Sequence, residues 1–179
     1  MKFFRKRKKI FLLLFSLFVI GDHALAIEEP EYRVESKSSD YEIRLYSPIL
    51  VAETAIQSDF EESGNKAFRI LADYIFGNNR SKATLAQKTT IAKQQSTSEK
   101  IAMTAPVNQI SATEGYLVQF TMPKQYSLET LPEPKDDRVK IRQIPARKIA
   151  VYTYSGSWSE QRFKEKLETF QAELKKDGI

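Results

Sequence analysis

The two halves of this chain repeat one order of predicted elements, strand, strand, helix, and this repeat constrains the fold most. Alternation of apolar and polar residues predicts a strand at 41–46, and an apolar run predicts a second at 49–56. A shift of 98 residues brings these two segments onto strand-like segments at 139–144 and 148–154. A shift of 99 residues brings the predicted first helix onto a second, so the repeat includes the helices.

Each predicted helix begins with a capping box, Ser-x-x-Glu, at Ser58–Glu61 and at Ser157–Glu160. Apolar residues at helical spacing then line one face of each helix, namely Phe60, Ala67, Phe68, Leu71 and Ile75 in the first and Phe163, Leu167, Phe170 and Leu174 in the second. We therefore predict an α+β domain of two ββαββ-like repeats with an antiparallel sheet, in which each helix buries its apolar face on the strands.

The second repeat is incomplete by this scheme. After its helix the first half continues with the apolar segment Lys100–Val107 and a strand-like segment at 116–122, whereas the second half ends at Ile179. We expect a domain over 41–179 that is truncated at its C-terminus, and a second unit that is naturally incomplete is the alternative. The strand edge left uncovered would then be open to a protein partner or to self-association.

The segment before this domain has the features of an export signal. Six Lys or Arg residues lie between 2 and 9, an apolar run follows at 10–20, and Ala24-Leu25-Ala26 resembles a cleavage site. Because the run is shorter than the roughly 20 residues that span a bilayer, it predicts a signal peptide over 1–26 and a periplasmic or secreted protein. An uncleaved membrane anchor is the alternative. The polar residues 27–40 predict a flexible lead-in.

Charge and composition exclude several function classes. Residues 1–26 hold six basic residues and one acidic residue, so the totals of 28 and 23 leave 22 of each sign in the remainder. A balanced charge argues against nucleic-acid binding. The chain has no cysteine, and its one histidine, His23, lies in the predicted signal peptide. We therefore predict no enzyme of the histidine or cysteine type, no zinc site and neither of the two commonest haem ligands.

The segment Lys100–Val107, predicted to be a buried strand, reads Lys-Ile-Ala-Met-Thr-Ala-Pro-Val and closely resembles the signature of the SOUL family, also called the haem-binding protein family. Further matching segments are Tyr41–Arg44, Tyr74–Asn78, Phe120–Pro123, Leu131–Pro134 and Tyr154–Gly156. The resemblance implies a distorted antiparallel β-barrel with two flanking helices. Family members typically end in a further strand after a Tyr-Asp-Pro-Pro turn, which agrees with the incomplete second repeat.

The resemblance also implies non-catalytic binding of haem or another tetrapyrrole, as a ligand, in a hydrophobic groove beside the first helix and without a histidine. The candidate residues are Ile70, Tyr74, Ile75 and Phe76 for apolar contacts, Arg69 and Arg80 for the carboxylates, and Met103 as a weak iron ligand. Core packing is the alternative for the apolar residues and Met103, and solvated surface is the alternative for the arginines. The alternative function is an envelope protein-interaction module with no haem role.

Overall fold

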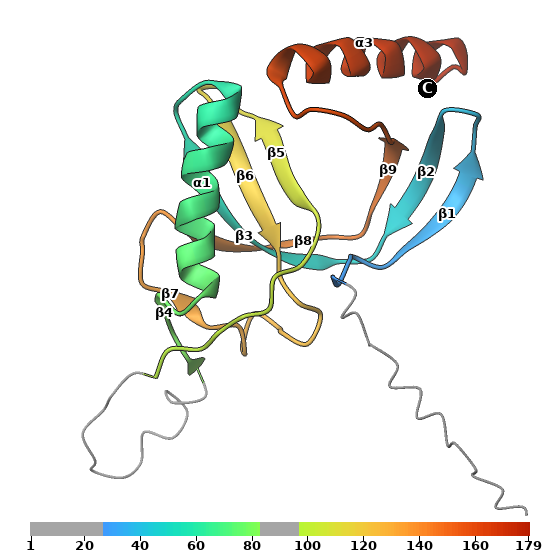
Figure 1. Cartoon of the computed structure of the whole chain (residues 1–179). Coiled ribbons are helices and arrows are strands. Elements are labelled where there is room, and N and C mark those ends of the chain that lie inside the picture. Colours follow the sequence, from blue (N-terminus) through green and yellow to red (C-terminus); the bar gives the residue numbers. More distant parts are fainter. Residues whose placement is uncertain (1–26, 83–96) are drawn as a thin grey trace, which may run out of the picture.

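A computed structural model describes residues 27–82 and 97–179, and Figure 1 shows the arrangement of the elements. The signal peptide predicted for 1–26 lies outside the described residues. The elements are β1 (Tyr32–Lys37), β2 (Tyr41–Tyr46), β3 (Ile49–Ile56), α1 (Phe60–Ile75), β4 (Asn79–Arg80), β5 (Val107–Ser111), β6 (Tyr116–Thr121), β7 (Glu133–Pro134), β8 (Lys140–Ile144), β9 (Arg147–Tyr152) and α3 (Glu160–Lys176).

The strands form three antiparallel sheets, with the orders β1-β2-β9, β5-β6-β3-β8 and β4-β7. This confirms the α+β class, but the closed barrel was wrong. The two larger sheets meet only at the corner where β2 runs into β3 and β8 runs into β9 (Figure 1). Pro48 and Pro145 lie in these corners, and proline cannot donate a hydrogen bond to continue a strand ladder. Each proline therefore lies where the chain passes from one larger sheet to the other.

The register of the strands follows the sequence repeat. Ile43 on β2 faces Ala150 on β9, and the shift of 98 residues turns this pair into Ile141 and Ala52, which face each other on β8 and β3. All the pairs between β3 and β8 are related in this way to pairs between β2 and β9. The first two strands of each half thus occupy equivalent positions, and the rest of the ββαββ scheme stays a prediction.

Strand β1 corrects the expectation of a flexible lead-in over 27–40. It pairs with β2 from Tyr32 opposite Tyr46 to Lys37 opposite Glu42. All its residues are exposed, and the alternation Tyr32-Arg33-Val34-Glu35 is too short to mark a strand clearly. The backbone ladder and contacts between the strands, including a Lys37–Glu42 ion pair of 3.0 Å, hold it in place instead.

The signature segment Lys100–Val107 is not a strand before Val107, where β5 begins. Its backbone N–H groups bond elsewhere, since Ile101 donates to the carbonyl oxygen of Ile75 at 2.8 Å and Ala105 donates to that of Glu28 at 2.9 Å. These partners are a helix end and a chain segment, not a row of strand residues, so no ladder forms. Burial was predicted correctly for Ile101, whereas Met103 is 44% exposed.

The core lies between α1 and the four-stranded sheet. It contains Leu50, Ala52, Ala67, Leu71, Tyr74, Ile75, Ile101, Val118, Phe120, Met122, Leu131 and Val139. Helix α3 has no buried residue and rests on the three-stranded sheet, where the Phe170 ring lies 5.9 Å from the Tyr41 ring and 5.6 Å from the Tyr152 ring. The burial of the predicted apolar face is therefore confirmed for α1 except at Phe68, which is 42% exposed, and only partly for α3.

Both helices are capped later than the sequence predicted. The N-cap of α1 is Asp59, whose side chain accepts a hydrogen bond from the Glu62 N–H at 2.7 Å, and the N-cap of α3 is Ser159. We expect Asp59→Ala to lower the free energy of unfolding by about 1 kcal/mol, the typical cost of losing an N-cap. Ser58→Ala is the matched control and should cost clearly less in urea denaturation. A larger loss for Ser58→Ala would restore the capping box predicted from the sequence.

Candidate functional site

A cavity of about 350 Å³ lies between the inner faces of the two larger sheets. Because side chains alternate along a strand, β1, β2 and β9 turn one set of residues into it and the other set towards α3 or solvent. The cavity is lined by Glu29, Pro30, Tyr32, Arg44, Tyr46, Ser47, Ile49, Ala105, Pro106, Asn108, Thr121, Ile144, Pro145, Arg147, Ile149 and Val151. The strands of the four-stranded sheet give two apolar and two polar side chains, whereas those of the three-stranded sheet give both arginines, both tyrosines, Ile149 and Val151.

The phenolic and charged side chains form one row across the three-stranded sheet. Tyr32 on β1, Tyr46 on β2 and Arg147 on β9 are partners in register. Arg44 precedes Tyr46 by two residues and shares its face, and its Nη1 donates to the Tyr46 hydroxyl oxygen at 3.3 Å. The Arg44 guanidinium also lies 4.3 Å from the centre of the Tyr32 ring, a cation–π contact. We call Tyr32, Arg44, Tyr46 and Arg147 the arginine–tyrosine row.

The two arginines of this row differ in their partners. Arg44 forms an ion pair of 2.8 Å with Glu42, and its hydrogen bonds to Tyr46 and then to Glu42 raise its pKa, so its charge is secure. Hydrogen bonds from Lys37 and, to a smaller extent, from Arg44 lower the pKa of Glu42, so this carboxylate is shared between two cations. Arg147 is exposed and forms no ion pair with any residue of the described ranges. The row therefore contributes two positive charges to the cavity, whose lining also includes the acidic Glu29.

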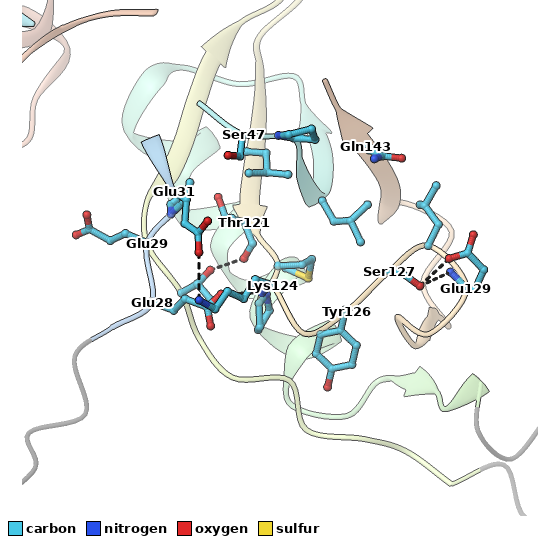
Figure 2. A pocket seen from close by; sticks show the side chains of 18 residues that line it. Glu28, Glu29, Glu31, Ser47, Thr121, Lys124, Tyr126, Ser127, Glu129 and Gln143 are labelled. Atoms are coloured by element: carbon cyan, nitrogen blue, oxygen red, sulfur yellow. Dashed lines mark hydrogen bonds and ion pairs between the residues drawn. The ribbon is translucent and has the colours of Figure 1, made fainter. Parts of the chain in front are cut away.

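A second cavity, of about 400 Å³, has a net negative lining and shares five residues with the first, namely Glu29, Pro30, Ser47, Ile49 and Thr121. Its acidic lining residues are Glu28, Glu29, Glu31 and Glu129. Figure 2 shows Lys124 beside Glu28 and Glu31, and its Nζ lies 3.2 Å from the Glu31 carboxylate. A ligand carboxylate would meet net negative charge here, so the cavity between the sheets is the better site for an anionic ligand.

The structure corrects two residues of the groove predicted beside α1. Tyr74 and Ile75 are each only 1% exposed and belong to the core. The Tyr74 hydroxyl donates to the Pro132 carbonyl oxygen at 2.8 Å, and burial raises the pKa of Tyr74. A tyrosine whose polar end finds a carbonyl inside the protein packs like an apolar residue, so neither side chain faces a groove. Ile70 is half-buried against the same core.

The other predicted residues are on the surface. Phe76 is 58% exposed and Met103 is 44% exposed, and Arg69 and Arg80 are exposed. Arg80 lies on β4 opposite Glu133. None of these four lines either of the two cavities described above, and their contact with a ligand stays a prediction.

Sequence analysis missed the arginine–tyrosine row, although part of its signal is visible. The alternation at 41–46 places Arg44 and Tyr46 on one face of β2 and Tyr41 and Ile43 on the other. The apolar face contacts α3 through Tyr41 and Phe170. Which face would line a cavity depended on the packing of the sheets, which the alternation does not specify.

The family can now be decided. The model of the family described as "SOUL heme-binding protein" matches residues 27–179. The chain belongs to the SOUL haem-binding family. The match begins before the domain boundary predicted at 41 and takes in β1 and its contribution to the cavity. A search of curated proteins finds none that matches this SOUL-family chain. Among the described residues, no helix has the length and apolar character needed to cross a membrane.

Proposed function

We propose that this SOUL-family protein binds haem or a related tetrapyrrole, without catalysis, in the cavity between its two larger sheets. The observation that carries the proposal is the union of apolar walls with two guanidinium groups, Arg44 and Arg147, in one cavity of about 350 Å³. Ligand pockets typically measure about 300–1,000 Å³ and combine apolar walls with a few placed polar groups. The export predicted from residues 1–26 is part of this proposal and would locate binding outside the cytoplasm.

The side chains of the cavity fit the chemistry of a porphyrin. Its macrocycle is flat and apolar and would pack against Ile49, Ile144 and Ile149, with about 25 cal/mol gained per Å² of apolar surface removed from water. Its two carboxylates need charged partners, and the planar guanidinium group can hold a carboxylate through two parallel hydrogen bonds. Because Arg147 is exposed, we place the carboxylates towards the arginine–tyrosine row and the mouth of the cavity. None of these contacts requires a histidine.

A titration with hemin, followed at the Soret band, tests this function. We expect saturable binding of one hemin per chain. The dimethyl ester of the same porphyrin, which lacks the charged carboxylates, should bind more weakly by about tenfold or more, since hydrogen bonds to charged groups contribute about 1.5–3 kcal/mol. The absence of saturable hemin binding by the folded protein would refute the proposal.

A second function is favoured by the free side of β9. This strand pairs with β2 only, within the described part of the chain. Beside it an apolar groove of about 290 Å³ runs under α3, lined by Ala150, Val151, Tyr152, Tyr154, Phe163, Lys166, Leu167 and Phe170. An unpaired strand edge next to an apolar groove is a surface that a further strand can cover.

We take a second copy of the chain as the occupant of this edge. Antiparallel pairing of β9 with itself over its full length would put Arg147 opposite Tyr152 and Lys148 opposite Val151. No like charges would face each other, and each cationic end would meet an aromatic end. The two α3 helices would then help to cover the apolar groove.

Sedimentation velocity over a range of protein concentrations tests this dimer. We expect Leu167→Glu to shift the protein to monomer, because Leu167 is 37% exposed on α3 and lines the groove and a charge would be buried on pairing. Phe76→Glu, at an exposed position at the end of α1, is the control and should leave the dimer unchanged. A wild-type protein that stays monomeric at every concentration would contradict self-association.

A further inference from the structure

The cavity between the sheets holds a candidate iron ligand that sequence analysis did not consider. The common axial ligands of haem are histidine, cysteine, methionine and tyrosine. The chain has no cysteine, and residues 27–179 contain no histidine. Met103 lines neither of the two cavities, and Met122 is buried beside the acidic one. Two phenols, those of Tyr32 and Tyr46, line the cavity between the sheets.

We infer that Tyr46 is the axial ligand of ferric haem bound in this cavity, an inference that rests on the proposed function. The Tyr46 oxygen accepts a hydrogen bond from Arg44 Nη1 at 3.3 Å, which orients the phenol and leaves a further lone pair on the oxygen. The neighbouring guanidinium supplies positive charge beside the negative charge that a coordinated phenolate carries. Arg147, the register partner of Tyr46 on β9, adds a second cation on the other side.

Tyr32 is the weaker candidate, although its ring centre lies only 5.2 Å from that of Tyr46. Arg44 lies over the face of the Tyr32 ring, at 4.3 Å from the centre, and donates no hydrogen bond to its hydroxyl group among the bonds of the described residues. Arg44 therefore contacts the π-electrons of Tyr32, whereas it contacts the hydroxyl oxygen of Tyr46. Tyr32 is also 41% exposed, at the outer edge of the three-stranded sheet.

The charges around Arg44 leave it able to support a phenolate. Glu42 is its carboxylate partner at 2.8 Å, but the same Glu42 also pairs with Lys37 at 3.0 Å. Two cations thus share one carboxylate, and a net positive charge remains next to Tyr46. Coordination makes one iron–oxygen bond and releases the phenolic proton to solvent, as metal binding to a protonated ligand does. The iron stays ferric, so the step needs no oxidant or reductant.

Visible absorption and resonance Raman spectra of the protein loaded with hemin test this inference. We expect the phenolate-to-iron charge-transfer band and the phenolate Raman modes in the wild type and in Tyr32→Phe, and their loss in Tyr46→Phe. Hemin affinity of Tyr46→Phe should fall by about 10- to 100-fold, the scale seen when the contacts around a metal ligand are disturbed. Affinity for metal-free protoporphyrin IX should fall much less than affinity for hemin, because that ligand has no iron to coordinate.

The outcomes separate the ligand from the function. Saturable hemin binding by the wild type without these phenolate signals, or with signals that persist in Tyr46→Phe, would overturn the assignment of Tyr46 and leave the proposed function intact. Signals lost in Tyr32→Phe but kept in Tyr46→Phe would move the ligand to Tyr32 and also overturn it. If neither hemin nor protoporphyrin IX binds to the folded wild type, the proposed function itself fails. Circular dichroism of both variants checks that the fold is kept.

Discussion

Replacing Arg44 and Arg147 together with alanine is expected to weaken hemin binding by about 100-fold or more, because each of the two lost hydrogen bonds to a charged group is worth about 1.5–3 kcal/mol and about 1.4 kcal/mol equals a factor of ten. Both side chains line the cavity between the sheets, and they are the two basic residues among those that line it. The loss should be much smaller for the porphyrin dimethyl ester, which offers no carboxylate. Soret titrations of both ligands measure it.

The matched control is the pair Arg69→Ala and Arg80→Ala, the two arginines that the sequence predicted for the carboxylates. Both are exposed, and neither lines the cavity between the sheets, so we expect this double variant to bind hemin like the wild type. The opposite pattern, with a loss for Arg69 and Arg80 and none for Arg44 and Arg147, would place the ligand in the groove beside α1.

Leu71→Ala is expected to lower the free energy of unfolding by about 2–5 kcal/mol, the usual cost of removing a buried leucine side chain. Leu71 is fully buried in the core between α1 and the four-stranded sheet. This loss of free energy has two parts. One is the loss of the apolar contacts of the removed atoms, and the other is the cost of the cavity that remains because α1 and the sheet cannot close the space. Urea denaturation followed by circular dichroism measures it.

Leu167→Ala is the control for this change, since it removes the same atoms from α3. Leu167 is 37% exposed, so the loss should be well below that of Leu71→Ala when measured at low protein concentration. Equal losses would contradict the description of α3 as a helix that covers its sheet only in part. Taken at high concentration, the same comparison would report on burial of α3 in a dimer.

The elements that the sequence predicted well are those whose pattern depends on their own residues. Strands β2 and β3 agree with the predicted ranges, because alternation or an apolar run marks a strand that packs on one face or on both. Even the pairing of β2 with β9 and of β3 with β8 obeys the shift of 98 residues. An internal repeat carries information about long-range pairing that a single strand does not.

The errors have a common physical cause, which is that the deciding partner is distant in the sequence. Strand β1 has only exposed residues and exists through its ladder with β2. The signature segment looked like a strand, but its Ile101 N–H donates to the end of α1 at Ile75. Tyr74 was predicted to face a groove, and the carbonyl of Pro132 makes its burial possible.

The candidate site shows the same limit. Period two identifies Arg44 and Tyr46 as neighbours on one face of β2, and that much could be read from the sequence. Arg147 joins them only through the register of β9, and Tyr32 only through β1, which was not predicted as a strand. The opposite wall, which includes Ile49 and Ile144, comes from another sheet. A site assembled between two sheets is therefore visible only when the sheets are placed.

The most direct test of the cavity as the tetrapyrrole site is a methyl NMR titration with metal-free protoporphyrin IX. The ring current of the macrocycle shifts the methyl signals of residues that pack against it. We predict shifts for Ile49, Ile144, Ile149 and Val151, whose side chains line the cavity between the sheets. The signals of Ile70, which belongs to α1, and of Met103, which lines neither of the two cavities, should not move. Shifts at Ile70 and Met103 with unchanged signals from the four cavity residues would contradict the account.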